Sequence, residues 1–284
     1  MNIFETENLY FLGPKGTYAQ LAMNKFVADL DIKAKNIIPL NPITKIIQAV
    51  DADKNAIAIL PIENSIEGIV RETIDNFVKL KDKNLKIAAE TIIPISHCLM
   101  SKATDIKEIK HVVSYTQALG QCSTYICNRI PNATIIEATS TSDAARLLQE
   151  KDNTYAAIAS EAAAEIYNLN ILDRAINDEK DNKTRFILLS RQERKSTGYD
   201  KTSIFFSIKN EPGSLFNVLS IFNMYKINLL YIESRPSRKK MGEYNFCIDI
   251  EGHKSDEKIA AAMNLVEQYT GSLILTGSYP RFKE

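Results

Sequence analysis

The sequence has no net charge and no strongly basic character. It contains 35 lysines and arginines against 35 aspartates and glutamates in 284 residues. Proteins attract nucleic acids and anionic membranes through a basic field, and this composition supplies none. Neither partner is therefore expected, and a small molecule or another protein is the better expectation.

Long apolar runs are also missing. No stretch approaches the roughly 20 apolar residues that a helix needs to cross a bilayer, and residues 1–7 lack the basic start of a secretory signal. The content of 45% hydrophobic and 25% charged residues is that of an ordinary soluble globular protein. We therefore expect a cytoplasmic protein that does not bind membranes.

Cysteine and histidine are scarce and scattered. None of the cysteines shows CxxC spacing and the histidines form no cluster in the sequence (Cys98, Cys122, Cys127, Cys247; His97, His111, His253). This spacing indicates neither a zinc knuckle nor a thioredoxin-type pair, and the scattered histidines argue against a metal site or a histidine-based nucleophile relay. The sequence thus predicts no metal site, and it predicts reduced, partly buried thiols.

Buried strands and amphipathic helices alternate over the first 190 residues. Strands are predicted at 7–12, 36–39, 56–60, 85–100, 111–114, 133–137, 155–159 and 186–189, and helices at 18–26, 42–50, 70–80, 117–129 and after residues 138 and 160. This alternation predicts an α/β fold with mostly parallel sheets. The long segment 85–100 suggests a passage between two lobes, the second at about 85–160, with a cleft between them.

A different pattern follows a loose, charged stretch at 191–198. We expect a first domain at 1–191, a linker at 192–200 and a second domain at 201–284. The second domain runs strand, helix, strand, strand, helix, strand. Its predicted elements are 202–208, 212–225, 227–234, 242–251, 255–269 with a Ser cap, and 273–277. This order defines a ferredoxin-like module, and its open sheet edge favours pairing with a second copy.

A glycine-rich turn follows the first strand. Gly13, Gly16 and Thr17 lie between a strand and a helix, where several N–H groups and the helix dipole favour an anion. The spacing GxxGT matches neither the dinucleotide fingerprint nor the phosphate-binding loop, so a nucleotide is not expected. A tight turn that uses glycine only for its backbone freedom is the alternative.

Polar side chains follow the buried strand at 56–60. Glu63, Asn64 and Ser65 come after its carboxyl end, where ligands bind in open α/β sheets. Surface loops are commonly polar as well. These three residues are therefore candidates for a binding site, with an ordinary surface loop as the alternative.

A run of hydroxyl side chains precedes the helix predicted after residue 138. It comprises Thr139, Ser140, Thr141 and Ser142. One hydroxyl should cap the helix, and a cluster of four is more than a cap requires. The others could donate hydrogen bonds to an anion at the same helix end.

The segment Asn182–Phe186 places a hydroxyl and a guanidinium at the start of an apolar strand. Neighbouring side chains of a strand face opposite sides, so Thr184 and Arg185 cannot both point into one core. A guanidinium suits carboxylates, and Asn182 adds a neutral hydrogen-bonding group. The alternative is a polar strand entrance with a surface arginine.

Taken together, these motifs resemble those of the monofunctional prephenate dehydratases with a C-terminal ACT domain. The matching segments are 13–17 (GPKGT), 61–65 (PIENS), 139–141 (TST), 182–186 (NKTRF), 213–216 (GSLF) and 233–236 (ESRP). The resemblance covers nearly the whole chain. It implies a two-lobed catalytic region like a type II periplasmic binding protein at 1–191, with the site in the cleft, and a ferredoxin-like ACT domain at 201–284.

The resemblance also implies an activity and its residues. The family converts prephenate to phenylpyruvate with loss of carbon dioxide and water, in phenylalanine biosynthesis, without a cofactor, and under feedback control by L-phenylalanine bound between ACT domains of a homodimer or homotetramer. By resemblance the catalytic residues are Thr184, Glu63, Asn64 and Arg185; the substrate-binding residues are Gly16, Thr17, Ser65, Thr139, Ser140, Thr141, Gln117 and Phe186; and the L-phenylalanine site comprises Gly213, Ser214, Leu215, Asn228, Glu233, Ser234 and Arg235.

The resemblance assigns Thr184 as the donor to the departing ring hydroxyl. A threonine hydroxyl is a weak acid, so we expect Thr184 to hydrogen-bond to the leaving oxygen while Glu63 or a water supplies the proton. The chain departs from the family at one place: Tyr115 and Thr116 stand where members often carry His-Pro. This departure puts a role for that histidine in doubt, and Gln117 and Gln121 remain as polar lining.

Two alternatives stay open at the level of sequence. A dehydratase that prefers arogenate would differ only at the group that meets the substrate's amine, and no carboxylate can be assigned to that role. A non-catalytic sensor would use the cleft to bind a small anion and the second domain to bind an amino acid. The joint presence of Glu63, Asn64, Thr184 and Arg185 argues against the sensor, because plain binding would not need them.

Overall fold

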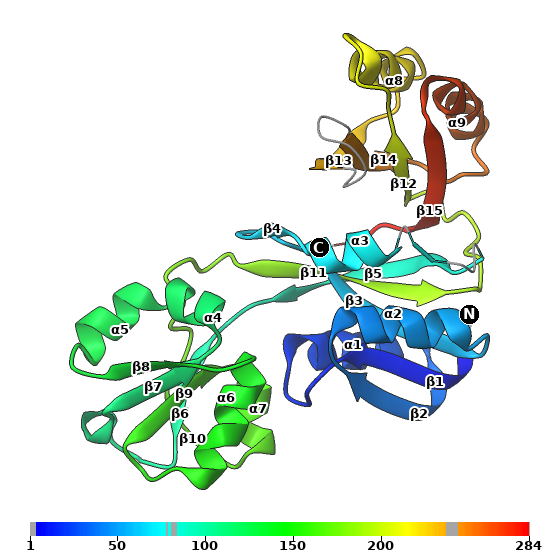
Figure 1. Cartoon of the computed structure of the whole chain (residues 1–284). Coiled ribbons are helices and arrows are strands. Elements are labelled where there is room, and N and C mark those ends of the chain that lie inside the picture. The colour runs from blue at the N-terminus through cyan, green and yellow to red at the C-terminus, as the bar shows by residue number, and fades with distance from the viewer. Residues whose placement is uncertain (1–3, 78, 81–83, 237–243, 284) are drawn as a thin grey trace. The chain divides into compact units, whose positions relative to one another are not determined.

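A computed structural model describes residues 4–77, 79–80, 84–236 and 244–283 (Figure 1). Its chain divides into two compact units. The first holds the chain up to Ile46, Ile59–Val70 and Ile92–Phe186; the second holds Ile47–Ala58, Arg71–Thr91 and the chain from Ile187. No helix in the described ranges is long and apolar enough to cross a bilayer. The predicted domain boundaries stay predictions, and the predicted strand start at Gly242 lies outside the described residues.

The first sheet carries the N-terminal strands and the strand of the Asn182–Phe186 motif. Its order is β2 (Lys33–Leu40), β1 (Glu5–Leu12), β3 (Ala56–Asn64), β11 (Lys183–Ser190), β5 (Lys86–Pro94), and the short β4 (Gly68–Ile69) pairs with β3. Its helices are α1 (Tyr18–Leu30), α2 (Ile43–Ala52) and α3 (Arg71–Phe77). Strand β3 continues to Asn64, because β4 pairs back on it in antiparallel register. Glu63 and Asn64 therefore lie on a strand end, not in the predicted loop.

The second sheet is mixed rather than mostly parallel. Its order is β10 (Asn170–Asp173), β6 (Cys98–Ser101), β9 (Tyr155–Ala159), β7 (His111–Ser114), β8 (Thr134–Glu137). Strand β7 pairs in parallel with β8 and β9, whereas β6 pairs antiparallel with β9 and β10. The prediction failed here because β6 enters this sheet from β5 of the first sheet and runs opposite to its neighbours β9 and β10, a direction that the alternation of strands and helices does not encode.

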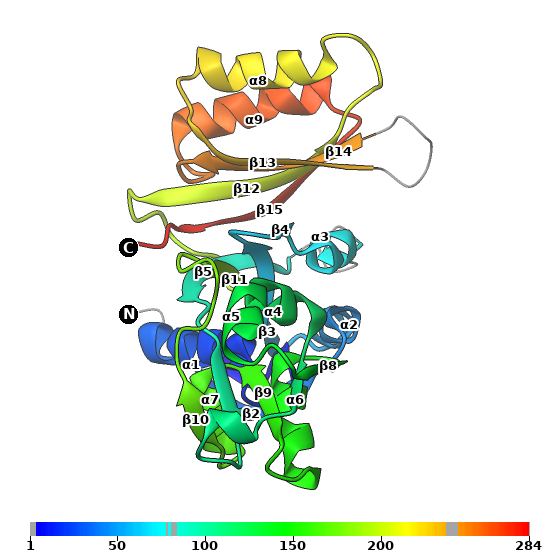
Figure 2. The same cartoon turned by 90° about the vertical axis from the view of Figure 1, so that its left-hand side faces the viewer.

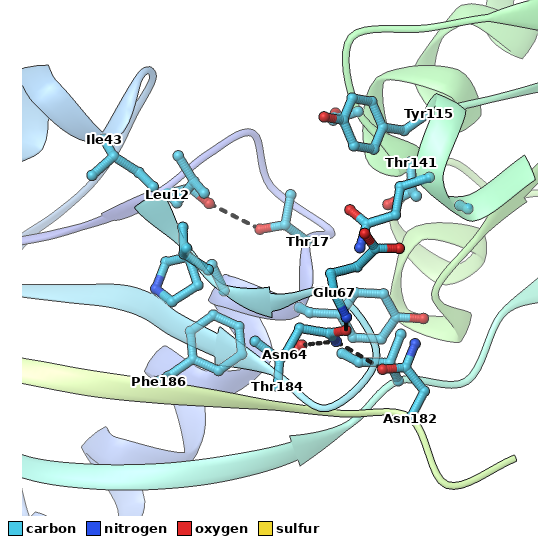
Figure 3. Close-up of a pocket in the computed structure, with 18 of the residues that line it drawn as sticks. Leu12, Thr17, Ile43, Asn64, Glu67, Tyr115, Thr141, Asn182, Thr184 and Phe186 are labelled. Atoms are coloured by element: carbon cyan, nitrogen blue, oxygen red, sulfur yellow. Dashed lines mark hydrogen bonds between the residues drawn. The ribbon is translucent and has the colours of Figure 1, made fainter. Parts of the chain in front are cut away.

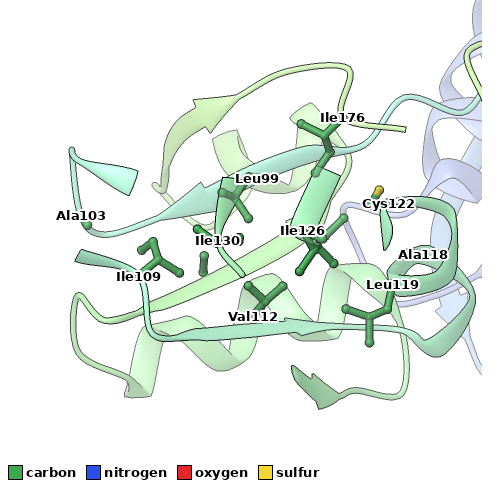
Figure 4. Close-up of a cluster of buried hydrophobic side chains, with 12 residues drawn as sticks. Leu99, Ala103, Ile109, Val112, Ala118, Leu119, Cys122, Ile126, Ile130 and Ile176 are labelled. Carbon is green, nitrogen blue, oxygen red and sulfur yellow. The ribbon is translucent and has the colours of Figure 1, made fainter. Parts of the chain in front are cut away.

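The helices of the second sheet are α4 (Thr116–Gln121), α5 (Ser123–Arg129), α6 (Thr141–Leu147) and α7 (Glu161–Ile166). The predicted single helix at 117–129 is thus two helices. They meet at the fully buried Cys122, whose backbone leaves the helical region at φ −121° and ψ 16°. This break lets Leu119 and Ile126 enter one apolar cluster with Val112 of the sheet (Figure 4). Burial raises the pKa of the Cys122 thiol to about 12, so the thiol stays protonated.

The third sheet is the predicted βαββαβ module. Its order is β13 (Leu229–Pro236), β14 (Tyr244–Glu251), β12 (Asp200–Ser207), β15 (Ser272–Pro280), and neighbouring strands are antiparallel. Figure 2 shows α8 (Ser214–Met224) and α9 (Glu257–Tyr269) side by side on one face of this sheet. Buried Ile204, Phe222 and Val266 belong to the core between the two layers. The prediction of a ferredoxin-like module is confirmed.

One predicted helix start in this module was wrong. Helix α9 follows Asp256 rather than a Ser cap. The Ser255 hydroxyl lies 2.7 Å from His253 Nδ1, and the Asp256 carboxylate accepts a hydrogen bond from the His253 N–H. Ser255 fails as a cap because a histidine two residues earlier occupies its hydroxyl.

The segment predicted as a loose linker is held at both ends. Residues 191–199 contain neither helix nor strand, but the Arg191 guanidinium donates to the carbonyls of Val50 and Asp53, near the end of α2. Near its other end, the Asp200 carboxylate accepts hydrogen bonds from the N–H groups of Thr197 and Gly198. Hydrogen bonds from charged side chains therefore fix both ends of this segment, which the charged composition had predicted to be loose.

Candidate active site

A cavity of about 480 Å³ lies in the first unit, between elements of the first and second sheets (Figure 3). Apolar side chains such as Leu12, Ile43 and Phe186 form part of its wall. Its polar lining residues are Thr17, Tyr18, Asn41, Asn64, Glu67, His97, Tyr115, Gln117, Gln121, Thr139, Ser140, Thr141, Asn182 and Thr184. An apolar cavity with converging polar groups is the usual form of a small-molecule site.

The cavity gathers most of the predicted catalytic and substrate-binding residues. Asn64, Thr184, Thr17, Gln117, Thr139, Ser140, Thr141 and Phe186 line it, whereas Glu63, Arg185, Gly16 and Ser65 do not. Sequence reasoning did not single out Tyr18, Asn41, Glu67, His97 or Tyr115 as site residues. The sequence marks Tyr115 only as a departure from the family, whereas the structure places this half-exposed ring in the cavity wall.

Asn64 fixes the orientation of the Thr184 hydroxyl. The Asn64 Oδ1 accepts hydrogen bonds from the backbone N–H groups of Ile66 and Glu67, both at 3.0 Å. Because backbone N–H groups only donate, the assignment of the amide oxygen and nitrogen is settled. The Asn64 Nδ2 therefore faces Thr184 Oγ1 and donates to it at 3.0 Å. The threonine oxygen accepts on that side, which leaves its own hydrogen for another acceptor.

The hydrogen-bonded chain continues away from Thr184. Asn64 Nδ2 also donates to Asn182 Oδ1 at 2.7 Å, and Asn182 Nδ2 donates to Gln121 Oε1 at 3.0 Å. Gln121 Oε1 lies 3.3 Å from His97 Nε2, and His97 Nδ1 lies 3.1 Å from the Tyr18 hydroxyl. Burial lowers the pKa of His97 to about 4, so the imidazole is neutral near neutral pH. Burial likewise raises the pKa of Tyr18 well above its usual range.

Thr184 and Arg185 point to different surroundings, as strand alternation predicted. Thr184 lines the cavity, whereas Arg185 is only 8% exposed and its Nε lies 3.0 Å from a Glu63 carboxylate oxygen. The guanidinium that was expected to meet substrate carboxylates is thus paired within the protein. This pair joins β3 to β11 beside the cavity.

The glycine-rich turn docks against two helix starts of the second sheet. The Ser160 hydroxyl donates to the Gly16 carbonyl at 2.8 Å, and the Ser142 hydroxyl donates to the Lys15 carbonyl. Gly16 has φ +83°, and a Cβ there would lie 2.9 Å from Ser142 Oγ. Its N–H donates to Gln20 Oε1 at 2.6 Å. The turn therefore requires glycine for a close approach, and the Gly16 N–H already has a partner.

Most of the predicted hydroxyl cluster has partners within the protein. Ser140 caps α6 by accepting from the Asp143 N–H, so the predicted cap is confirmed. The Thr139 hydroxyl donates to Asp143, and Ser142 contacts the glycine-rich turn. Among the residues that the structure describes, the Thr141 side chain has no hydrogen-bond partner, and it lines the cavity. Thr141 is therefore the member available to a ligand.

Glu67 gives the cavity wall a formal negative charge. Within the described ranges, Glu67 is the only lining residue of the types Asp, Glu, Lys and Arg. Over the same part of the chain, no group of three His, Cys, Asp or Glu residues is arranged to hold a metal ion. The site therefore offers neutral hydrogen-bonding groups, an apolar wall and a single carboxylate.

A smaller cavity of about 270 Å³ lies in the βαββαβ module. It is lined by Gly213, Ser214 and Leu215 of the predicted effector site, together with Lys209, Phe216 and Tyr244 among others. The remaining predicted effector residues, Asn228, Glu233, Ser234 and Arg235, lie outside this lining. Arg235 is buried, and its guanidinium lies 3.2 Å from the Asp75 carboxylate of α3. Ser234 nevertheless lies beside this cavity, because on β13 it pairs with Phe246 of the cavity lining.

Comparison with known proteins is consistent along nearly the whole chain. The family model for prephenate dehydratase matches residues 9–194, and the model for the ACT domain matches residues 202–264. The prephenate dehydratase of Methanocaldococcus jannaschii is 41% identical, with 95% of this chain and 96% of that protein covered. The chloroplastic arogenate dehydratase/prephenate dehydratase 2 of Arabidopsis thaliana is 33% identical over 95% of this chain and 72% of that protein.

A solved structure agrees with this assignment. The prephenate dehydratase of Arthrobacter aurescens, solved in complex with L-Phe, superposes with a TM-score of 0.87 at 33% identity, covering 96% of this chain and 90% of that one. The shared length includes both sheets around the larger cavity and the βαββαβ module. The chain therefore belongs to the prephenate dehydratase family.

Proposed function

We propose that the larger cavity converts prephenate to phenylpyruvate, carbon dioxide and water, with Thr184 as the donor to the departing hydroxyl. The observation that carries this proposal is the hydrogen bond from Asn64 Nδ2 to Thr184 Oγ1. It occupies the threonine oxygen as an acceptor and directs the hydroxyl hydrogen elsewhere. Thr184 lines the cavity, so a ligand there can accept that hydrogen.

The reaction needs help at its leaving group. The ring carboxylate leaves as carbon dioxide, its bond electrons form the aromatic ring, and the hydroxyl at the opposite ring carbon departs. Hydroxide is a poor leaving group unless it is protonated or hydrogen-bonded in the transition state. Thr184 supplies the hydrogen bond. Glu63 is paired with Arg185 and lies outside the cavity lining, so a water molecule is the better source of the proton.

Neutral donors bind the substrate in this proposal. The carboxylates of prephenate accept hydrogen bonds from Gln117 and Thr141, and the apolar ring packs on Phe186. Gly16, Ser65 and the pair of Glu63 and Arg185 act as the framework that positions these side chains. No organic cofactor is needed, because the substrate itself provides the electrons that form the aromatic ring.

The activity is tested by following phenylpyruvate absorbance after addition of prephenate. Thr184→Val, which keeps the shape and removes the hydroxyl, is expected to lower kcat about a hundredfold and to leave KM nearly unchanged, as for a donor that acts mainly in the transition state. Thr184→Ser retains the hydroxyl and should keep most of the activity. Normal turnover by the valine variant would remove Thr184 from the mechanism.

The ACT module is proposed to bind L-phenylalanine at the smaller cavity. Gly213 and Ser214 offer N–H groups for the carboxylate of the amino acid, and Leu215 offers an apolar contact for its ring. Phe216 is 71% exposed at this cavity, which favours completion of the site by a second copy in a homodimer or homotetramer. Support comes from the related structure that contains L-Phe. A cytoplasmic enzyme of phenylalanine biosynthesis is the corresponding cellular role.

Regulation requires L-phenylalanine to bind one arrangement of the molecule better than another. Arg235 of the ACT match contacts Asp75 of the prephenate dehydratase match, and α3 follows the β3–β4 hairpin in the chain. We assign this ion pair as the contact through which the effector acts. Inhibition by added L-phenylalanine in the phenylpyruvate assay tests the regulatory part separately from catalysis.

A further inference from the structure

Glu67 is the single carboxylate among the described residues that line the larger cavity, and the other polar groups there are neutral. It lies in the hairpin between β3 and β4, and its backbone N–H donates to Asn64 Oδ1 at 3.0 Å. The same Asn64 amide donates a hydrogen bond to Thr184. Asn64 therefore fixes the positions of both Glu67 and the Thr184 hydroxyl. Figure 3 shows the Glu67 side chain directed away from Thr184 and toward Thr141.

The charge of Glu67 is not compensated by the protein. Among the described residues, its carboxylate has no hydrogen bond or ion pair, and the cavity wall contributes no lysine or arginine. His97 does not balance it, because burial lowers the pKa of this imidazole to about 4. A ligand that fills the cavity therefore meets one unpaired negative charge.

The negative charge of Glu67 discriminates between two related substrates, prephenate and arogenate. Prephenate ends in a keto acid and has only negative charges, so its side-chain carboxylate is disfavoured near Glu67. The corresponding α-amino acid, arogenate, carries an ammonium group beside that carboxylate, and an ammonium is attracted by Glu67. With the ring hydroxyl at Thr184, the side chain at the opposite ring carbon extends away from Thr184, which is the direction of the Glu67 carboxylate.

We propose that Glu67 is a specificity-determining residue that pairs with a substrate ammonium, so that the cavity accepts arogenate as well as prephenate. The inference rests on the proposed function, since both substrates lose carbon dioxide and water by the same step. Glu67 takes no part in that step. It affects the binding of one substrate relative to the other.

The test compares kcat/KM for prephenate and for arogenate in the full-length protein. Glu67→Gln keeps the size and removes the charge. It is expected to lower kcat/KM for arogenate about tenfold, mainly by raising KM. This factor is the size expected for the loss of one partly shielded charge contact. For prephenate it should leave kcat/KM unchanged or raise it. Glu165→Gln, at an exposed position on α7, is the matched control and should alter neither value.

The outcomes separate this inference from the proposed function. If the wild-type protein converts neither substrate, the proposed function fails. If it converts prephenate but Glu67→Gln changes both substrates by the same factor, or neither, the role of Glu67 is overturned while the function stands. A structural effect of the substitution would lower both values together, so only a change in their ratio supports the proposal.

Discussion

The candidate active-site cavity and the smaller cavity of the ACT module differ in how completely hydrogen bonds fix their lining. In the larger one, hydrogen bonds within the chain hold Asn64, Asn182 and Gln121 before a ligand arrives. The smaller one in the ACT module is bordered by side chains that face solvent, with Phe216 at 71% exposure. A site for chemistry gains from groups fixed in advance, because reorganisation then costs nothing in the transition state. A site for regulation can be completed on binding.

The largest expected effect comes from reversing one hydrogen bond in the ordered cavity. Asn64→Asp replaces the donor to Thr184 with an acceptor, so the Thr184 hydroxyl turns its hydrogen toward the new carboxylate. We expect kcat for prephenate to fall at least a hundredfold, as for loss of an oriented donor. Asn36→Asp is the control, since the Asn36 amide donates to Asn8 at an exposed position. Turnover within tenfold of wild type would contradict the orienting role of Asn64.

An intermediate effect is expected where the glycine-rich turn docks. Gly16→Ala places a Cβ 2.9 Å from Ser142 Oγ and 3.3 Å from the Cα of Ala163, at φ +83°. The combined backbone strain and crowding should cost about 2 kcal/mol, and Tm should fall by about 5 °C for a protein of this size.

Gly198 provides the matched control for this substitution. It has φ +82°, and apart from its chain neighbours no atom lies within 4 Å of the place that a Cβ would take, so Gly198→Ala tests strain without crowding. We expect it to cost about 1 kcal/mol. Equal losses of Tm for both variants would show that the turn is not tightly docked. Adding Ser142→Ala to Gly16→Ala should recover part of the difference.

The smallest effect is expected for the coupling between L-phenylalanine binding in the ACT module and activity at the larger cavity. Asp75→Asn removes the charge that faces the largely buried Arg235. Without effector, kcat and KM for prephenate should not change. The L-phenylalanine concentration for half-inhibition should shift about fivefold, which corresponds to about 1 kcal/mol of coupling.

A surface ion pair serves as the control for Asp75. Asp29→Asn disrupts the exposed pair with Lys25, 2.9 Å apart on α1, and should leave inhibition unchanged. Equal inhibition of the Asp75→Asn and wild-type proteins would exclude the ion pair as the path of regulation, and catalysis would be unaffected by that result.

The features that sequence analysis predicted depend on local periodicity. The alternation of a strand placed Thr184 and Arg185 on different sides, and a helix start required a cap, which the structure assigns to Ser140. The order of elements also predicted the βαββαβ module correctly. Each of these depends on residues within a few positions of one another.

What sequence analysis missed depends on contacts between distant segments. The pairing of Arg185 with Glu63 requires the register between β11 and β3, which neither motif contains. Glu67 enters the cavity because Asn64 closes a turn with its side chain, and the break at Cys122 arises from packing against the second sheet. Local sequence does not encode such distances, so these residues could not be assigned in advance.

Two chain segments connect the first and second sheets: the one between β5 and β6, and the one between β10 and β11. Hydrogen bonds join them to each other. The Ile95 N–H donates to the Asn182 carbonyl at 2.8 Å, and the His97 N–H donates to the Asn177 side chain at 2.6 Å. These two hydrogen bonds join the segments at the place where the chain passes from one sheet to the other. Because Asn182 also accepts a hydrogen bond from Asn64, the connection between the two sheets contacts the amide that orients Thr184.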